Sequence, residues 1–378
     1  MKKDFNGFVI FVPGIMGSTL IKTGLDKHGK EICKYVWSAD LGINKDILGN
    51  NPDLLKEENV IPKEVIKKIT LVRKYDESTR GTDKIKSIFL GAVGSFRGIK
   101  KELVLYGDLI DFCLSKDVGL GLKDNHNFFT FPYDWRMCNM RTAEIMRDYI
   151  YKIDPEKKKE IIFIAHSMGG VIARLLLDNY PDIKSRTITL IQIASPMKGS
   201  AKAYYTLKVR PVINEYFDPV WVWEHRRHPD IAHRLMSVIN EFSSIYQLLP
   251  PGDRPTMYDS DGEPYYALDS NAWINCNCIE QARVVHEILK KNIDYDVKCL
   301  FSCGLKTVMQ YKIDEYFNID GTEEQSSKGD GTVLCSSAYA FSTKDQRREV
   351  IDVEADHNGI CKSKEMLKML KDIFYEAI

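Results

Sequence analysis

The sequence predicts an α/β fold, in which a mostly parallel β-sheet is covered by helices on both faces. Apolar runs of strand length recur along the 378 residues, and helical patterns lie between several of them. The runs that we interpret as buried strands are FVIFV (8–12), FFTF (128–131), IIFIA (161–165), ITLIQIA (188–194), VKCLFSC (297–303) and EVIDV (349–353). A strand that is apolar on both faces is typical of a parallel sheet, because the connecting helices cover both sides.

Two segments have the periodicity of amphipathic helices. Their apolar residues recur at i, i+3, i+4 and i+7. These residues are Met146, Tyr149, Ile150 and Ile153 in one segment, and Met366, Met369, Leu370 and Ile373 in the other. Because this spacing puts the apolar side chains on one face of a helix, we expect both segments to pack against the sheet.

Two stretches do not follow the alternation of strands and helices. The first, from roughly Leu20 to Gly98, is mixed in character and contains one candidate strand, ITLVRKY (69–75). The second, from Gly199 to about Asn277, combines aromatic residues with turn residues. We interpret both as insertions into a single domain that spans 1–378, and the second insertion as a cap or lid.

The charge balance argues against nucleic acid as a partner. Lys and Arg together number 53, as do Asp and Glu, so the chain has no net charge to attract a polyanion. Hydrophobic residues make up 44% and charged residues 28%, which are ordinary values for a globular protein. Since no apolar window reaches the roughly 18 residues of a membrane-spanning helix, we expect any membrane contact to be peripheral.

The N-terminus and the cysteines predict a cytoplasmic protein. Asp4 interrupts the apolar character that follows two lysines, and the remaining run, 8–12, is too short for a secretory leader. Nine cysteines are an odd number, and several lie in apolar surroundings. We therefore expect reduced thiols, for example at Cys113, Cys299, Cys303 and Cys335.

The segment AHSMGG (165–170) lies where the apolar run 161–165 gives way to a helical pattern. A serine between small residues at a strand-to-helix turn is typical of the nucleophile elbow of α/β hydrolases, usually written G-x-S-x-G. Here Ala165 replaces the first glycine, and its small side chain still meets the steric demand of the turn. Ser167 is therefore the candidate nucleophile, and its hydroxyl needs a base to take the proton.

The partners of the serine follow it along the chain in this class of fold, first an acid and then a histidine. His357, in EADHNG after the run 349–353, is the candidate base. Asp330, in KGDGTV, is the candidate acid, and Asp320, in the similar IDGT, is the alternative. His166 is adjacent to the serine, but its side chain at a strand end points to the other side of the chain. We interpret it as a buried supporting residue.

Acyl chemistry also needs backbone N–H groups that bind the oxyanion of the tetrahedral intermediate. One donor is expected to be Met168, directly after the nucleophile, and the other a residue in a loop after an early strand. The loop VPGIMGS (12–18) fits, because Gly14 and Gly17 permit a close approach of the backbone, and we assign Ile15 as the donor. The loop lacks the lysine and the glycine spacing of a phosphate-binding P-loop, so no nucleotide is expected.

Several motifs follow one another in a fixed order over nearly the whole chain. They are VPGIMGS (12–18), YGDLIDFCLSKDVGLG (106–121), FPYDWR (131–136), AHSMGG (165–170), ASPMKGS (194–200), IYQLLP (245–250), GDGTV (329–333) and the late His357. This set resembles the lecithin:cholesterol acyltransferase-like and lysosomal phospholipase A2-like lipases and acyltransferases of the α/β-hydrolase superfamily. The resemblance implies the roles given above for Ser167, Asp330, His357, Ile15 and Met168, and it implies a cap and a mobile lid over an acyl-binding cleft.

Three further features have two interpretations each. In FPYDWR, we favour an internal strut of Asp134 with Arg136 over a substrate contact. The aromatic residues Phe217, Trp221 and Trp223 are either substrate or lid contacts, touching an acyl chain or a bilayer, or the small core of the cap itself. In EHRRHPDIAH (224–233), a basic lid surface that contacts anionic lipid head groups is favoured over a zinc site, because the spacing does not match a strong zinc pattern.

These observations together predict a serine hydrolase or acyltransferase that cleaves lipid acyl esters, phospholipid first, through an acyl-enzyme on Ser167. No metal or other cofactor is expected. The alternatives are a soluble esterase or thioesterase that acts on a small acyl substrate, and a non-catalytic hydrolase-like binding protein. The sequence contains no signal for an oligomeric state.

Overall fold

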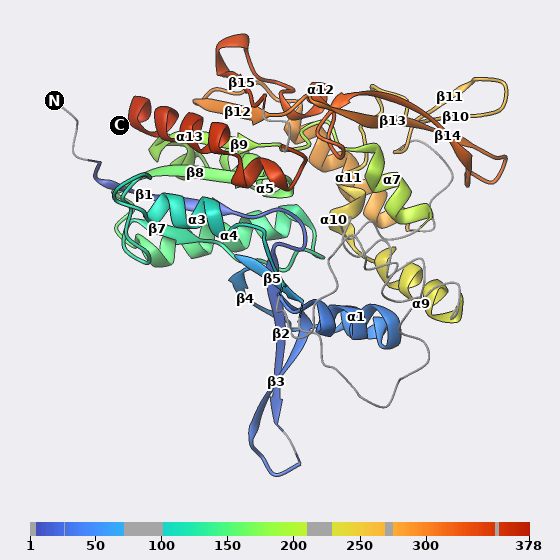
Figure 1. The fold of residues 1–378 in the computed structure, drawn as a ribbon, viewed down its shortest axis with the longest axis horizontal. Helices are drawn as coiled ribbons and strands as arrows, with labels where there is room; N and C mark the ends of the chain where they lie inside the picture. Colours follow the sequence, from blue (N-terminus) through green and yellow to red (C-terminus); the bar gives the residue numbers. More distant parts are fainter. Residues whose placement is uncertain (1–4, 26, 72–100, 210–228, 269–274, 352–354) are drawn as a thin grey trace.

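A computed structural model describes residues 5–25, 27–71, 101–209, 229–268, 275–351 and 355–378. Its central feature is a six-stranded sheet in the order β15-β12-β9-β8-β1-β7, in which every neighbouring pair of strands is parallel (Figure 1). The strands are β1 (Gly7–Val12), β7 (Phe128–Thr130), β8 (Glu160–His166), β9 (Thr187–Ile193), β12 (Val297–Phe301) and β15 (Arg347–Glu349). The α/β fold predicted from the sequence is confirmed.

Alternate residues of the central strands face two different cores, because side chains of a strand alternate between its faces. In β1, Phe8 and Ile10 belong to one buried cluster, whereas Val9 and Phe11 belong to the other. The helices on the first face are α4 (Asn139–Ile153) and α5 (Met168–Asn179), and those on the second are α3 (Gly107–Leu114) and α13 (Lys364–Ala377). Each fully buried Ile or Phe side chain contributes about 1.5–3 kcal/mol to this arrangement.

Both predicted amphipathic helices form, as α4 and α13. The N-terminus of α13 is capped by Ser363, whose hydroxyl accepts a hydrogen bond from the N–H of Met366 at 3.3 Å. Met366, Leu370 and Ile373 are buried on the face of α13 that packs on the sheet. The helical periodicity in the sequence therefore correctly predicted the face of α13 that packs on the sheet.

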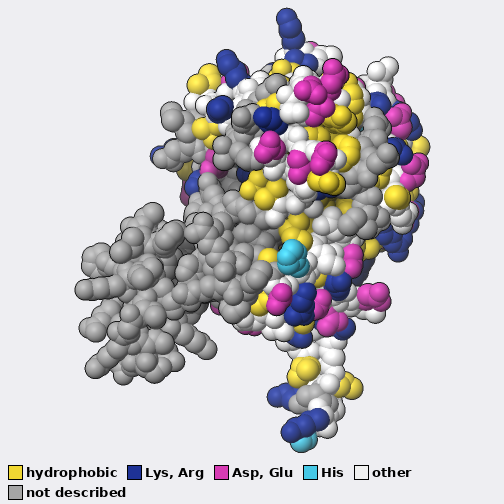
Figure 2. Space-filling model, turned by 90° about the vertical axis from the view of Figure 1, so that its right-hand side faces the viewer, with side chains coloured by type: hydrophobic (Ala, Val, Ile, Leu, Met, Phe, Trp, Pro, Cys, Tyr) yellow, Lys and Arg dark blue, Asp and Glu magenta, His cyan; other side chains and the backbone are white. Residues whose placement is uncertain are grey.

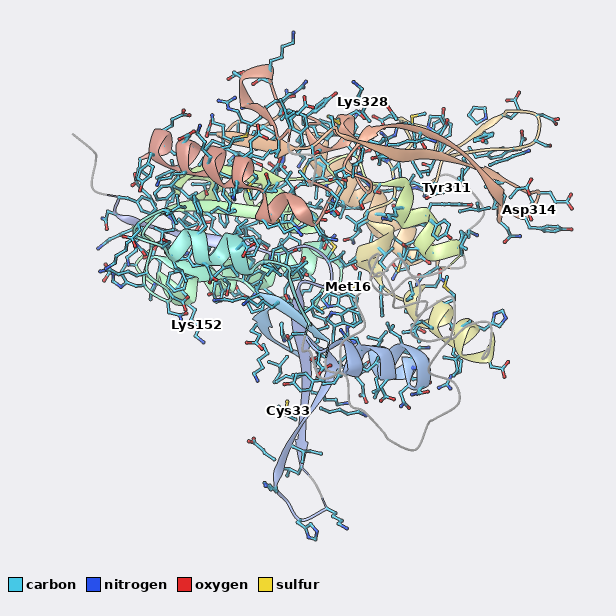
Figure 3. The ribbon with its side chains drawn as sticks, in the orientation of Figure 1. Met16, Cys33, Lys152, Tyr311, Asp314 and Lys328 are labelled. Atoms are coloured by element: carbon cyan, nitrogen blue, oxygen red, sulfur yellow. A yellow bond between two sulfur atoms is a disulfide. The ribbon has the colours of Figure 1, made fainter. Side chains whose placement is uncertain are left out.

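The first predicted insertion contributes a small sheet and helical segments beside the main sheet. A three-stranded antiparallel sheet has the order β3-β2-β4, and its β2–β3 hairpin projects away from the body of the molecule (Figures 1 and 2). Figure 3 shows Cys33 on this hairpin, and Met16 at the base of the hairpin, near the centre of the molecule. The elements are β2 (Ser18–Leu25), β3 (Glu31–Trp37), α1 (Leu41–Asn50), η1 (Pro52–Lys56), β4 (Ile61–Val65) and β5 (Lys68–Leu71). β5 pairs with β6 (Lys101–Val104), which lies just beyond the predicted insertion.

The second predicted insertion contributes helices and one edge of a second sheet. Its described elements are α7 (Ala201–Lys208), α9 (Pro229–Ile239), α10 (Ser243–Tyr246), β10 (Met257–Tyr258) and β11 (Pro264–Tyr265). Strands β10 and β11 join β13 (Leu305–Ile313) and β14 (Ile319–Gly329) in the order β11-β10-β13-β14. The remaining elements are α6 (Pro181–Arg186), α11 (Cys276–Leu289), α12 (Cys335–Ala338), η2 (Lys344–Gln346), η3 (Gly359–Lys362). The division into one domain with two insertions stays a prediction.

The structure corrects two expectations. The last strand of the sheet is Arg347–Glu349, so the predicted strand 349–353 overlaps it only at Glu349; Ile351 is 78% exposed, and 352–353 lie outside the described residues. The apolar run misled because an edge strand needs no continuous apolar sequence. Cys303 and Cys335, expected as thiols, form a disulfide, whereas the other seven cysteines are free. The two lie 32 positions apart, so only folding brings them together.

Among the described residues, no helix is long and apolar enough to cross a membrane.

Candidate active site

The strand-to-helix turn at Ser167 has the strained backbone of a nucleophile elbow. β8 ends at His166 and α5 begins at Met168, so one residue makes the whole turn. Ser167 has φ 54° and ψ −127°, which is unfavourable for a residue with a Cβ. Glycine is also required two residues after it, because a Cβ on Gly169 would lie 2.4 Å from the carbonyl oxygen of Val12. The small residues of AHSMGG therefore let α5 pack directly against β1.

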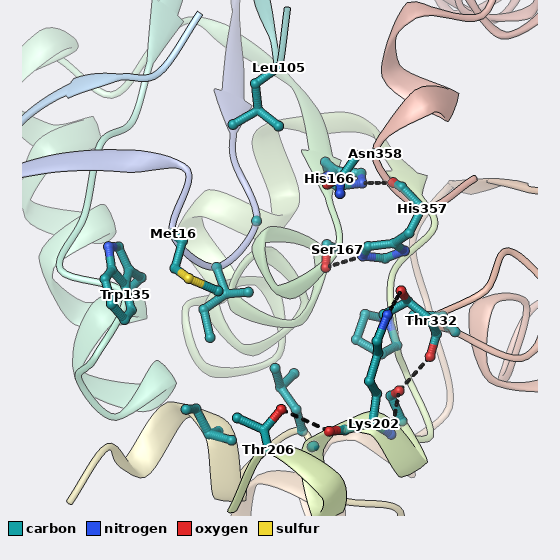
Figure 4. A pocket seen from close by; sticks show the side chains of 18 of the residues that line it. Met16, Leu105, Trp135, His166, Ser167, Lys202, Thr206, Thr332, His357 and Asn358 are labelled. Carbon is teal, nitrogen blue, oxygen red and sulfur yellow. Dashed lines mark hydrogen bonds between the residues drawn. The ribbon is translucent and has the colours of Figure 1, made fainter. Parts of the chain in front are cut away.

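The three residues predicted as a triad lie together at the carboxyl edge of the main sheet. His357 Nε2 is 2.8 Å from Ser167 Oγ (Figure 4). His357 Nδ1 is 2.8 Å from Asp330 Oδ2. All three side chains are largely buried, and the His357 side chain is 12% exposed. This is the geometry that lets an imidazole take a proton from the serine while a carboxylate holds the ring. The rival acid, Asp320, is exposed on β14.

The Asp330 carboxylate is fixed by the backbone of its own loop. Oδ1 accepts hydrogen bonds from the N–H groups of Thr332 at 2.9 Å and Val333 at 2.7 Å. Gly331 provides the turn at φ 85°, and its N–H donates to Thr307 Oγ1 at 2.8 Å. Burial opposes the charge, but the His357 ring and these N–H donors outweigh burial and hold the pKa of Asp330 below its usual range. The acid is therefore ionised when the ring beside it becomes cationic.

His357 is anchored through its backbone as well as its ring. Its N–H donates to the carbonyl of Asp330 at 3.0 Å, and its own carbonyl oxygen lies 2.8 Å from His166 Nε2. The loop between β15 and η3 thus presents the imidazole to Ser167 with two backbone contacts. Neither contact involves the imidazole ring of His357.

His166 lies behind the site and not within reach of Ser167 Oγ as a base. It is 2% exposed, and its Nδ1 lies 2.9 Å from the hydroxyl oxygen of Tyr106. Burial, together with the nearby His357, lowers the pKa of His166 to about 3, so the ring is neutral at physiological pH. The prediction that His166 is buried is confirmed, and its supporting role stays a prediction.

The loop predicted to supply an oxyanion donor lies against the nucleophile. A Cβ built on Gly14 would be 2.9 Å from Ser167 Cβ and 3.2 Å from His166 Nδ1, so only glycine fits this approach. Tyr133 holds the same loop by donating its hydroxyl hydrogen to the carbonyl of Pro13 at 2.9 Å. Ile15 lines the same cavity as Ser167. The roles of Ile15 and Met168 as backbone donors remain predictions that this proximity supports.

A cavity of about 330 Å³ opens from the triad into an apolar region. Figure 4 shows Trp135 across this cavity from His357. Trp135 packs edge-on against Trp37 at 5.3 Å and Phe242 at 5.9 Å between ring centroids, and we call these three residues the tryptophan end of the cavity. Other apolar residues that line the cavity are Leu48, Leu55, Ile66, Ile69, Ile239, Ile245 and Leu248. Lys202 and Thr332 line it near the triad, with Nζ and Oγ1 3.2 Å apart.

The FPYDWR motif forms the predicted internal strut. Arg136 pairs with Asp134 through two hydrogen bonds of 2.8 and 2.6 Å, and both side chains are 9% exposed. Arg136 also donates to the carbonyl of Leu55 at 2.6 Å and to that of Glu57 at 3.1 Å. The strut therefore connects the end of the sheet to the first insertion and positions Trp135 between them.

Some predicted residues lie outside the described part of the chain, and some residues of the site were not predicted. Phe217, Trp221 and Trp223 belong to the first group. Tyr106, Trp37 and Trp135 belong to the second, although Tyr106 and Trp135 stand inside motifs that carry the family resemblance. No local pattern marks Trp37, because its place at the cavity depends on how the first insertion folds.

Known proteins share both sequence and fold with this chain. The family model "Lecithin:cholesterol acyltransferase" matches residues 96–315. Lecithin-cholesterol acyltransferase-like 4 of Arabidopsis thaliana is 32% identical over 142 residues, which cover 35% of this chain and 24% of that protein. The match therefore spans about a quarter of that relative's length. In the crystal structure of the Tle4-Tli4 complex, one chain has a similar fold, with a TM-score of 0.56, 15% identity and 98% coverage of each chain.

Proposed function

The chain belongs to the lecithin:cholesterol acyltransferase family, and from that premise we propose that it is a serine hydrolase or acyltransferase that cleaves acyl esters of lipids. The substrate class that we favour is phospholipid. The observation that carries the proposal is the pair of 2.8 Å contacts that His357 makes with Ser167 Oγ and Asp330 Oδ2. A base between a serine and a buried carboxylate fits nucleophilic acyl transfer.

The first half of the reaction forms an acyl-enzyme. His357 Nε2 takes the proton of the Ser167 hydroxyl while Oγ attacks the carbonyl carbon of the ester. His357 then gives that proton to the departing alcohol, and the ester bond to this alcohol breaks. Asp330 accepts the Nδ1–H hydrogen bond throughout and stabilises the imidazolium that exists between the two steps.

The second half releases the acyl group. A water molecule or an acceptor alcohol loses its proton to His357 and attacks the acyl carbon. The bond between the acyl carbon and Ser167 Oγ then breaks, and Oγ takes the proton from His357. In both halves the former carbonyl oxygen becomes negative. We propose that the N–H groups of Ile15 and Met168 bind it, each contributing about 3 kcal/mol to the transition state.

The apolar part of the cavity supports a lipid acyl chain as the group that is transferred. It begins beside Ser167 and is lined by aliphatic and aromatic side chains up to Trp37, Trp135 and Phe242. Burial of each methylene of a chain in such surroundings contributes about 0.8 kcal/mol. A long acyl chain therefore gains binding energy that a small acyl group does not.

The test compares the wild-type chain with Ser167→Ala. Wild type is expected to react with a fluorophosphonate at Ser167, to hydrolyse phospholipid in vesicles, and to act more weakly on a soluble 4-nitrophenyl ester of a short acid. Ser167→Ala is expected to lose labelling and to lose about 10⁶-fold in kcat. Lipidomics of cells that express each form then identifies the lipid class that changes.

Other outcomes would redirect the proposal. Labelling of Ser167 with activity on short esters alone would make the protein a soluble esterase or thioesterase. A wild-type chain that fluorophosphonate does not label, and that turns over no ester, would be a binding protein with a hydrolase fold.

A further inference from the structure

A continuous path of hydrogen bonds joins the loop at Gly14 to the loop at His357 behind the nucleophile. The N–H of Gly14 donates to the Tyr106 hydroxyl at 2.9 Å. That hydroxyl lies 2.9 Å from His166 Nδ1, and His166 Nε2 lies 2.8 Å from the carbonyl oxygen of His357. The path links a residue near the N-terminus to one near the C-terminus through the residue next to Ser167.

The direction of each hydrogen bond in this path is fixed by its ends. A carbonyl oxygen only accepts, so His166 Nε2 must carry the hydrogen that it shares with His357. In the neutral ring Nδ1 is then an acceptor, and the Tyr106 hydroxyl donates to it. The same hydroxyl oxygen accepts from Gly14. Every polar group of the path is therefore satisfied in one arrangement.

Burial makes this arrangement the stable one. Tyr106 and His166 are both 2% exposed, and their rings pack edge-on at 5.5 Å. Burial lowers the pKa of His166 to about 3 and raises that of Tyr106, so both groups stay neutral over the physiological range. A charged His166 would need a hydrogen on Nδ1, which would face the Tyr106 hydroxyl with a second donor.

We propose that Tyr106 and His166 are positioning residues. They hold the loop 12–18, which we call the oxyanion loop, and the backbone of His357 in a fixed relation to each other on the two sides of Ser167. The inference rests on the proposed function, and it deepens it. Acyl transfer needs the donor of the oxyanion loop and the imidazole on either side of one reacting carbon, and a misplacement of about 1 Å costs up to about 100-fold in rate. The two loops come from opposite ends of the chain, so this path sets their spacing directly.

Single substitutions separate the two halves of the path. In the place of His166, Asn reaches the position of Nδ1 and Gln reaches that of Nε2. His166→Asn keeps a partner for Tyr106 and gives up the bond to His357, whereas His166→Gln keeps the bond to His357 and gives up the partner of Tyr106. Tyr106→Phe removes the link to both neighbours. For all three variants we expect kcat to fall about 10–100-fold, with KM changed less than threefold.

A double-mutant cycle tests whether the two residues act as one path. Tyr106→Phe combined with His166→Asn is expected to be no slower than the slower of the two single variants, because either change interrupts the same path. Tyr133→Phe is the matched control, since Tyr133 is also buried and holds the same loop, but through Pro13 and not through His166. Its effect on kcat is expected to multiply with that of His166→Asn.

The measurements are kcat and KM on one ester substrate, the rate of fluorophosphonate labelling of Ser167, and thermal unfolding of each full-length variant. Folded variants with wild-type kcat and labelling rate would overturn the positioning role. Effects of Tyr106→Phe and His166→Asn that multiply, as in the Tyr133 control, would also overturn it. Failure of the proposed function is a different result, because the wild-type chain itself would then show neither labelling nor turnover.

Discussion

The two ends of the cavity are built on different principles. At the triad end, Ser167 follows β8 of the main sheet, Asp330 follows β14 of the second sheet, and His357 precedes η3; each is held by hydrogen bonds of 3.0 Å or less. At the tryptophan end, Trp37 comes from the first insertion and Phe242 from the second, and their rings pack edge-on against Trp135. The triad end is therefore held by directional hydrogen bonds, whereas the shape of the tryptophan end is set by the volumes of its side chains.

This difference implies that the two ends have different roles in catalysis and in substrate selection. Hydrogen bonds fix atoms to within tenths of an ångström, which acyl transfer needs. Apolar packing tolerates changes of shape and responds to the length of a chain in the cavity. We therefore expect changes at the triad end to alter the rate for every substrate, and changes at the tryptophan end to alter the choice among substrates.

The largest effect after loss of the nucleophile is expected for Asp330→Asn. The amide cannot hold the imidazole in the required tautomer or stabilise its charge, so kcat should fall about 10⁴-fold for short and long esters alike. The control is Asp320→Asn, in the similar sequence on β14, where the side chain is exposed. Steady-state kinetics on both esters measure the effect. A loss below tenfold, or an equal loss in the control, would remove Asp330 from the triad.

The strut between the two ends is expected to matter for stability. Arg136→Met leaves the buried carboxylate of Asp134 without its partner, and breaking a buried pair in this way costs about 3–5 kcal/mol in the free energy of unfolding. Arg141→Met is the control, because Arg141 pairs with Glu144 on the surface at 60% and 41% exposure. It should change the free energy of unfolding by less than about 1 kcal/mol. Urea unfolding distinguishes the two, and equal losses would contradict a special role for the strut.

The tryptophan end is tested by Phe242→Ala. Loss of the ring should lower kcat/KM for esters with long acyl chains by about 10–100-fold and leave a short-chain ester within twofold. Phe374→Ala is the control, since Phe374 is equally buried on the opposite face of the sheet. It should lower stability without changing the preference for chain length. A uniform loss for all chain lengths in Phe242→Ala would show that the two ends are not independent.

The smallest effect concerns the pH dependence of stability, which depends on two buried histidines. His166 lies at the triad end, and His286, on α11, donates to the carbonyl of Leu249 at 2.8 Å. Burial lowers their pKa values in the folded state to about 3 and about 4. Between pH 6.5 and these values the unfolded chain binds protons that the folded chain does not, so stability is complete above pH 6.5 and is lost as the pH falls.

Each histidine is expected to contribute up to about 1.4 kcal/mol per pH unit to this loss. Urea unfolding from pH 7.5 to 4.5 measures the slope, and His166→Asn or His286→Asn should each make it shallower. The window ends above the range in which Asp330, whose pKa is depressed, loses its own contribution. An unchanged slope in both variants would mean that the rings are already protonated in the folded chain.

The central strands other than β15 were accessible from the sequence because burial on both faces leaves a local mark, whereas their order in the sheet was not predicted. The run 161–165 is apolar throughout, and the run 188–194 is apolar except at Thr189 and Gln192; they correspond to β8 and β9. The elbow was accessible for a similar reason, since a sharp turn restricts its own residues to small ones. Asp330 and His357 followed from chain order and from glycine-rich or polar loops after strands. In each case the choice of amino acid is restricted by local structure, so the restriction can be recognised in the neighbouring sequence.

What only the tertiary structure decided is the set of contacts between distant segments. The strut from Arg136 to Leu55, the disulfide between Cys303 and Cys335, and the meeting of Trp37 with Phe242 at Trp135 have no local mark. The path from Gly14 through Tyr106 and His166 to His357 belongs with them. Hydrogen bonding and packing across a folded chain depend on where each segment lies in space. The sequence therefore determined which groups are available for acyl chemistry, and the tertiary structure determined the positions and distances at which these groups are held.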